Sequence, residues 1–69
     1  MSNDGASLRK TIHDLNNVLT RIVASAELIA FQASDDQVVQ DARAICDAAL
    51  AGRELVADLG SNVERFSQP

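Results

Sequence analysis

Apolar residues recur along the first half of the chain at a spacing typical of a helix. Between residues 8 and 29 the steps between them are alternately four and three, a heptad pattern that no β-strand produces. The positions are Leu8, Ile12, Leu15, Leu19, Ile22, Ala26 and Ile29. This pattern predicts a first helix over about residues 7–32 that carries one continuous apolar stripe.

A second heptad pattern follows a short polar break. Its positions are Val38, Ala42, Ile45, Ala49, Gly52, Val56, Leu59, Val63 and Phe66. Ser34 and Gln37 have the spacing of a capping box, and Asp35 and Asp36 suit the positive end of a helix dipole. We therefore expect a turn at 33–36 and a second helix over about 36–66. Gly52 lies on the second stripe, where a glycine either allows close approach of a neighbouring helix or softens its own helix.

Two long helices joined by so short a connection predict an all-α fold: one domain over residues 1–69, an antiparallel two-helix hairpin. Each stripe is wider than one neighbouring helix can cover, and a chain of 69 residues buries little surface by itself. Cys46 is the single cysteine, so no disulfide within the chain can compensate. We expect a homodimer in which two hairpins form a four-helix bundle, with a marginally stable monomeric hairpin as the alternative.

Composition excludes several classes of function. A net charge of −4 opposes general nucleic-acid binding, because phosphate contacts need an excess of lysine and arginine. No apolar run approaches the ~20 residues that cross a bilayer, and the polar start lacks the features of an export signal. A lone cysteine without such a signal is typical of a cytoplasmic protein. The sequence has no cysteine–histidine cluster, so we expect no metal site.

The stretch T-I-H-D-L-N-N-V-L-T-R-I at residues 11–22 contains the only histidine, His13. At about 100° per residue His13 lies just outside the apolar stripe, in a polar sector of the helix. The other members of this sector are Arg9, Lys10, Asn17 and Thr20, with Arg21 one turn further on and Asp14 at its border. Such a sector is ordinarily only helix surface. Asn16 and Asn17, however, lower helix propensity by about 1 kcal/mol together without serving the stripe, which indicates a functional role.

A solitary imidazole restricts the possible chemistry. Cys46 lies on the apolar side of the other helix, so a nucleophile–base pair with His13 is not expected. An accessible imidazole can itself act as a nucleophile near neutral pH. The cations Arg9, Lys10 and Arg21 favour a phosphoryl group as the electrophile, because they stabilise its oxygens. Asp14 is placed to orient the ring and to accept its proton.

The segment H-D-L-N-N-V-L at residues 13–19 resembles the H-box of sensor histidine kinases, in which the histidine precedes an acid and often Asn-Asn. A-G-R-E-L-V-A-D-L at 51–59 and F-S-Q at 66–68 are similar to the end of the second helix in that family's dimerisation and histidine-phosphotransfer domain. The resemblance covers nearly the whole chain. It implies the same hairpin, paired into a four-helix bundle.

By this resemblance His13 accepts the phosphoryl group and Asp14 orients or deprotonates it. Asn17 matches the Asn or Thr that, in the family, positions water to dephosphorylate a receiver's aspartate. The expected reaction is phosphoryl transfer between His13 and the aspartate of a response-regulator receiver domain, with a histidine kinase as another possible donor. The patch formed by Arg9, Lys10, Thr20 and Arg21 would contact the phosphate or the partner. Mg²⁺ is expected on the receiver, and no cofactor in this chain.

The sequence also departs from the family. It contains no glycine-rich nucleotide-binding segment and has no room for an ATP-binding domain, so autonomous kinase activity is not expected. It also lacks the Lys-Gly pair that usually follows the histidine of monomeric phosphotransfer bundles. Two alternatives stay open. The first concerns origin: the chain is either a stand-alone protein or a fragment of a kinase. The second concerns function: the chain is a non-catalytic dimeric adaptor or inhibitor, which binds a kinase or receiver by mimicking the phosphotransfer domain.

Overall fold

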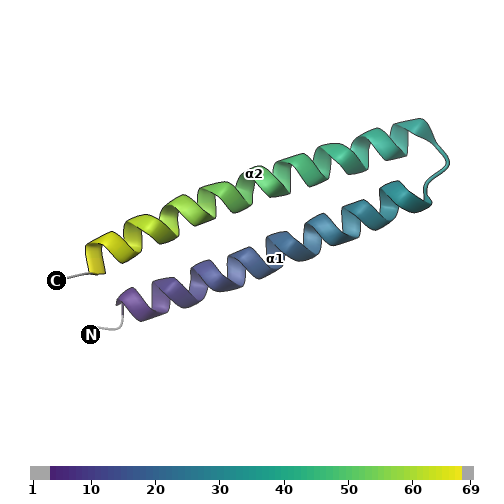
Figure 1. Ribbon diagram of the computed structural model, residues 1–69. Coiled ribbons are helices and arrows are strands. Elements are labelled where there is room, and N and C mark those ends of the chain that lie inside the picture. The colour runs from purple at the N-terminus through teal and green to yellow at the C-terminus, as the bar shows by residue number, and fades with distance from the viewer. Residues whose placement is uncertain (1–3, 68–69) are drawn as a thin grey trace.

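The computed structural model describes residues 4–67, with side chains described from residue 6 to residue 63. Within this part the chain forms two α-helices and no strand: α1 spans Asp4–Gln32 and α2 spans Asp36–Ser67. The helices run antiparallel and side by side (Figure 1). The predicted all-α hairpin is therefore confirmed. Residues 1–3 of the expected polar start, and the last residue of the F-S-Q segment, lie outside the described residues.

The turn between the helices is capped by Asp35. Its side-chain Oδ1 accepts a hydrogen bond from the backbone N–H of Gln37 at 2.8 Å, and its carbonyl oxygen accepts one from the N–H of Val39 at 3.1 Å. The predicted capping box between Ser34 and Gln37 is therefore wrong, since Asp35 is the N-cap and aspartate caps as well as serine. The side-chain amide of Gln37 instead donates to Oδ1 of Asp41 at 2.9 Å.

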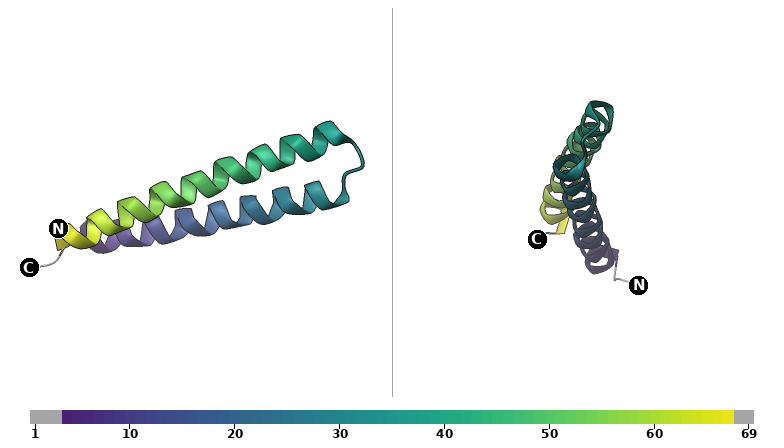
Figure 2. Two further views of the ribbon diagram at one scale, coloured as in Figure 1. Left: turned by 45° about the horizontal axis from the view of Figure 1, so that its top comes forward. Right: turned by 90° about the vertical axis from the view of Figure 1, so that its right-hand side faces the viewer.

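The two helices contact each other through small residues. Ala26, Ala42 and Ala49 are only 1–5% exposed, and Val63 completes the buried apolar residues of the described part. No larger side chain there is fully buried. Half-buried residues flank the alanines, namely Ile12, Asn16, Leu19, Val23, Ala30, Val39, Cys46 and Val56. The hairpin is thus a rod of two close helices with a thin core (Figure 2).

The axial register follows from three contacts between the helices. Ile12 lies opposite Gly60, Leu19 opposite Gly52, and Val23 opposite Cys46. At Gly52, a Cβ atom would lie 3.4 Å from Cδ2 of Leu19, so this side chain packs directly on the α2 backbone. The helix continues without a break through Gly52. Of the two alternatives for this glycine, close approach is therefore the one observed.

Only one edge of each apolar stripe is used in this contact. On α1, Ile12, Leu19 and Ala26 face α2, whereas the alternate positions of the stripe remain 40–46% exposed. The exposed set is Leu8, Leu15, Ile22 and Ile29 on α1, with Val38, Ile45 and Leu59 on α2. The physical reason is that a heptad stripe spans two directions around a helix, and a single neighbour covers one of them.

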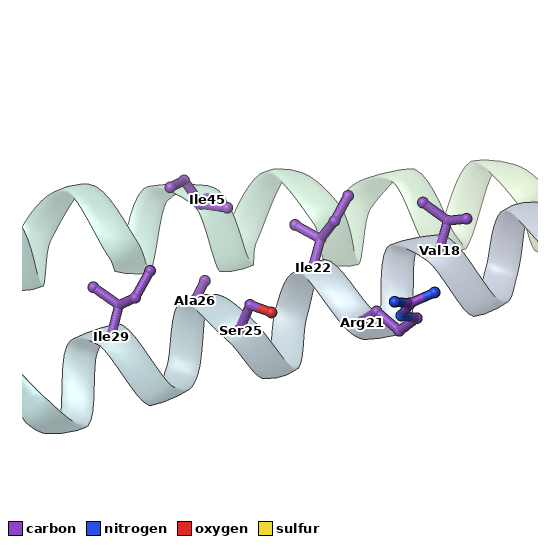
Figure 3. A pocket seen from close by; sticks show the side chains of 7 residues that line it. All are labelled: Val18, Arg21, Ile22, Ser25, Ala26, Ile29 and Ile45. Carbon is purple, nitrogen blue, oxygen red and sulfur yellow. The ribbon is translucent and has the colours of Figure 1, made fainter.

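Part of these uncovered edges, at Ile22, Ile29 and Ile45, forms an apolar groove of about 420 Å³ along one side of the hairpin. It is lined by Val18, Arg21, Ile22, Ser25, Ala26 and Ile29 of α1 and by Ile45 of α2 (Figure 3). We call this surface the apolar groove. In the described residues, neither helix combines the length and the apolar character that crossing a bilayer requires.

Replacing Ala42 by leucine is expected to lower the free energy of unfolding by about 1–3 kcal/mol, because the larger side chain separates helices that touch through alanines. The matched control is Ala44→Leu, two residues along on the exposed side of α2, with an expected change within about 0.5 kcal/mol. Urea unfolding followed by circular dichroism measures both. An Ala42→Leu variant as stable as its control would contradict the close alanine contact.

Candidate functional site

His13 lies on α1 and is exposed to solvent. On its α2 side it borders a recess of about 370 Å³ between the two helices. The recess is lined by Arg9, Ile12, His13 and Asn16 from α1 and by Gly60 and Ser61 from α2. We call it the His13 recess. The imidazole is thus accessible both from solvent and from the space between the helices.

The His13 side of α1 points away from the apolar groove. At about 100° per residue, Ile22 of the groove lies about 180° around the helix from His13. The residues that face α2, such as Val23 and Leu19, lie about 80–120° from His13 on the intervening side. Any structure that covered the apolar groove would therefore leave the imidazole open.

The carboxylate of Asp14 is bonded to a lysine in this structure. Nζ of Lys10 donates to Oδ2 of Asp14 at 2.9 Å, and both side chains are more than half exposed. No hydrogen bond joins Asp14 to His13 among the described residues. An exposed pair of this kind contributes little to stability and opens readily. The pair occupies Oδ2 and leaves Oδ1 of Asp14 able to accept a further hydrogen bond.

The other predicted site residues fall into different surroundings. Arg9 lines the His13 recess, and Asn17 is exposed one turn beyond His13. The hydroxyl of Thr20 donates to the backbone oxygen of Asn16 at 2.8 Å, so it is engaged by its own helix. Arg21 lines the apolar groove, about 12 Å along α1 from His13. The predicted cationic patch thus extends from Arg9 at the His13 recess to Arg21 at the edge of the apolar groove.

Gly60 and Ser61, which lie beside His13, had no role in the sequence-based prediction, and Asn16 was singled out there without a specific role. Asn16 is half-buried at the edge of the interhelical contact. It also lines the neighbouring recess of about 310 Å³, with Leu50, Arg53, Glu54 and Ala57. The one signal available for Gly60 was a glycine inside a helical pattern, which lowers helix propensity. Its position across from His13 depends on the axial register of the two helices.

Cys46 is not a second nucleophile of this site. Its thiol donates to the carbonyl oxygen of Val23 at 3.7 Å, on the seam between the helices. Desolvation by burial, and then the negative charges of Glu27 and Asp47, raise the pKa of the thiol above its ordinary value. A protonated thiol is a poor nucleophile and a poor metal ligand. The described residues also contain no group of three or more side chains suited to hold a metal ion.

The raised pKa of Cys46 predicts a loss of stability at high pH. The folded state holds the thiol proton more tightly than the unfolded state. The protonated thiol therefore makes its full contribution to the free energy of unfolding below the unfolded pKa of about 8.5, and this contribution declines as pH rises above that value. Urea unfolding between pH 7 and pH 10 measures the effect, with Cys46→Ala as the control in which this part of the decline disappears. Identical pH profiles for the two chains would contradict the assigned shift.

Comparisons with known proteins leave the function to be argued from this geometry. No family model, no curated protein and no solved structure matches the chain. The assignment therefore depends on the exposed imidazole, on the recess beside it and on the pattern of residues around it.

Proposed function

We propose that this chain is a histidine phosphotransfer protein of a two-component phosphorelay, which passes a phosphoryl group between His13 and the aspartate of a response-regulator receiver domain. The observation that carries the proposal is the solvent-exposed imidazole beside an open recess, on the side of the hairpin opposite the apolar groove. The resemblance of residues 13–19 to an H-box supports the same assignment.

In the proposed step, Nε2 of neutral His13 attacks the phosphorus of an aspartyl phosphate in line with its bond to the aspartate. The N–P bond forms as the P–O bond breaks, the aspartate carboxylate leaves with the electron pair, and Nδ1 of the ring keeps its proton. A carboxylate oxygen of Asp14 accepts a hydrogen bond from this Nδ1–H. Arg9, at the edge of the recess, stabilises the phosphoryl oxygens. Mg²⁺ belongs to the receiver.

Asn17 has a proposed second role, in removing phosphate from the receiver by positioning water. It lies on the His13 side of α1, about 6 Å further along the axis and about 40° around it. Its side chain is exposed, so it can contact a partner that is docked on His13. The position supports this role, which the H-box resemblance suggests.

The second part of the proposal is that two copies of the chain pair through the apolar groove as a four-helix bundle. The buried apolar residues of the described part are three alanines and one valine, which offset little of the conformational entropy lost on folding. Larger aliphatic side chains, among them Ile22, Ile29 and Ile45 of the groove, remain 40–46% exposed. A second hairpin would bury them, and the two His13 side chains would face outward.

The phosphotransfer proposal predicts that receiver domains labelled with radioactive acetyl phosphate transfer label to the wild-type chain and not to His13→Gln. Label on the chain should be acid-labile and base-stable, as expected for a phosphoramidate bond. Cys46→Ala serves as the control for a substitution away from the site and should accept label like the wild type. Receivers or kinases that bind the chain without ever labelling it would favour the non-catalytic adaptor or inhibitor instead.

The dimer proposal predicts a melting temperature that rises with protein concentration. Ile45→Glu, in the apolar groove, should shift the chain to a monomer in sedimentation equilibrium, because it places charge at the pairing surface. Leu50→Glu is the matched control: Leu50 and Ile45 are 44% and 46% exposed, but Leu50 lies on the opposite, polar side of the hairpin. A wild-type chain that sediments as a monomer at all concentrations would refute the dimer.

A further inference from the structure

We propose that Gly60 is a specificity-determining position for the receiver. Because glycine has no side chain, the α2 side of the His13 recess keeps space for the receiver loop that carries the aspartyl phosphate. The inference rests on the proposed phosphotransfer function and deepens it. It concerns a residue of the second helix, whereas the residues that resemble an H-box all belong to the first.

The fold itself does not require glycine at position 60. Gly60 lies inside α2 and does not have a positive φ angle, so any residue can adopt its backbone conformation. A Cβ atom built there meets only Cγ2 of Ile12, at 3.8 Å, which is ordinary van der Waals contact. Glycine in a helix interior costs about 1 kcal/mol relative to alanine. Gly60 is half-buried opposite Ile12, but this contact has room for a Cβ. A residue that opposes its own helix where the packing does not demand it is a candidate for a functional role.

The position of Gly60 indicates what that role is. Among the residues with described side chains, α2 contributes Gly60 and Ser61 to the lining of the His13 recess. A larger side chain at position 60 would extend over Ile12 and occupy the space beside the imidazole. The neighbouring recess on the same side has larger α2 side chains in its lining, among them Leu50 and Arg53. Of these two recesses, the one beside His13 therefore has the smaller α2 residues in its lining, and its volume is the larger, about 370 against 310 Å³.

Phosphoryl transfer explains why such an opening is useful. The phosphorus of the donor must approach the ring nitrogen to about 3–3.5 Å and in line, so the backbone that carries the aspartyl phosphate also comes close to the hairpin. The polar side chains of Arg9, Asn16 and Ser61 surround the space that this loop would enter. A small phosphate donor needs no such space, because the imidazole is also exposed to bulk solvent.

The experiment compares Gly60→Leu with Gly60→Ala, using labelled receiver domains and phosphoramidate, a small donor that phosphorylates histidine directly. Both residues are good helix formers, so both variants should melt no lower than the wild type. Gly60→Leu is expected to lower kcat/KM for transfer from the receiver at least tenfold, mainly through a higher KM. Its labelling by phosphoramidate should stay within threefold of the wild-type rate. Gly60→Ala should behave like the wild type with both donors.

Three outcomes would overturn the inference. Wild-type transfer kinetics in Gly60→Leu would show that the receiver does not enter past Gly60. A parallel loss of phosphoramidate labelling would show that the leucine shields the imidazole itself, with no selection of the partner. A wild-type chain that phosphoramidate labels but no receiver does would overturn the relay and the role of Gly60 together. This last result differs from the first, because in the first the wild type and Gly60→Leu both accept phosphoryl groups from the receiver.

Discussion

The alanine contact between α1 and α2 is the constraint on which the rest of the structure depends. Ala26, Ala42 and Ala49 allow the helices to approach closely, and this approach brings one edge of each apolar stripe to the seam. The aliphatic side chains of the other edge are then left on the surface, where Ile22, Ile29 and Ile45 line the apolar groove. The same rotation of α1 directs His13 to the opposite side and places it across from Gly60.

The hairpin therefore has two chemically different sides. One is an aliphatic groove suited to an apolar surface such as a second copy of the chain. The other has recesses lined by polar and charged side chains, and among these is the imidazole. A phosphotransfer protein needs both properties at once, because its scaffold must be stable while its nucleophile stays open to a partner. The separation of the two sides allows one to be covered without closing the other.

Electrostatics around His13 are more balanced than the number of nearby cations suggests. Lys10 is paired with Asp14, and Arg21 lies at the apolar groove. Arg9 lines the recess, and Asn16 and Ser61 are its uncharged polar residues. In the proposed phosphoryl transfer, the receiver supplies its own metal ion and carboxylates. The chain then contributes the imidazole, the groups that orient it and the shape of the space beside it.

The sequence by itself determined the number and approximate limits of the helices, the antiparallel hairpin and the exposure of His13. These features follow from the spacing of residues within one helix and from the length of one turn, which are local properties of the chain. The location of the N-cap at Asp35 and not Ser34 was missed, because neighbouring polar residues can all cap a helix. Only the tertiary structure decided which edge of each stripe faces the other helix, and that Gly60 and Ser61 lie beside the imidazole. Both depend on the rotation and axial register of two helices relative to each other, which the heptad pattern of a single helix does not encode.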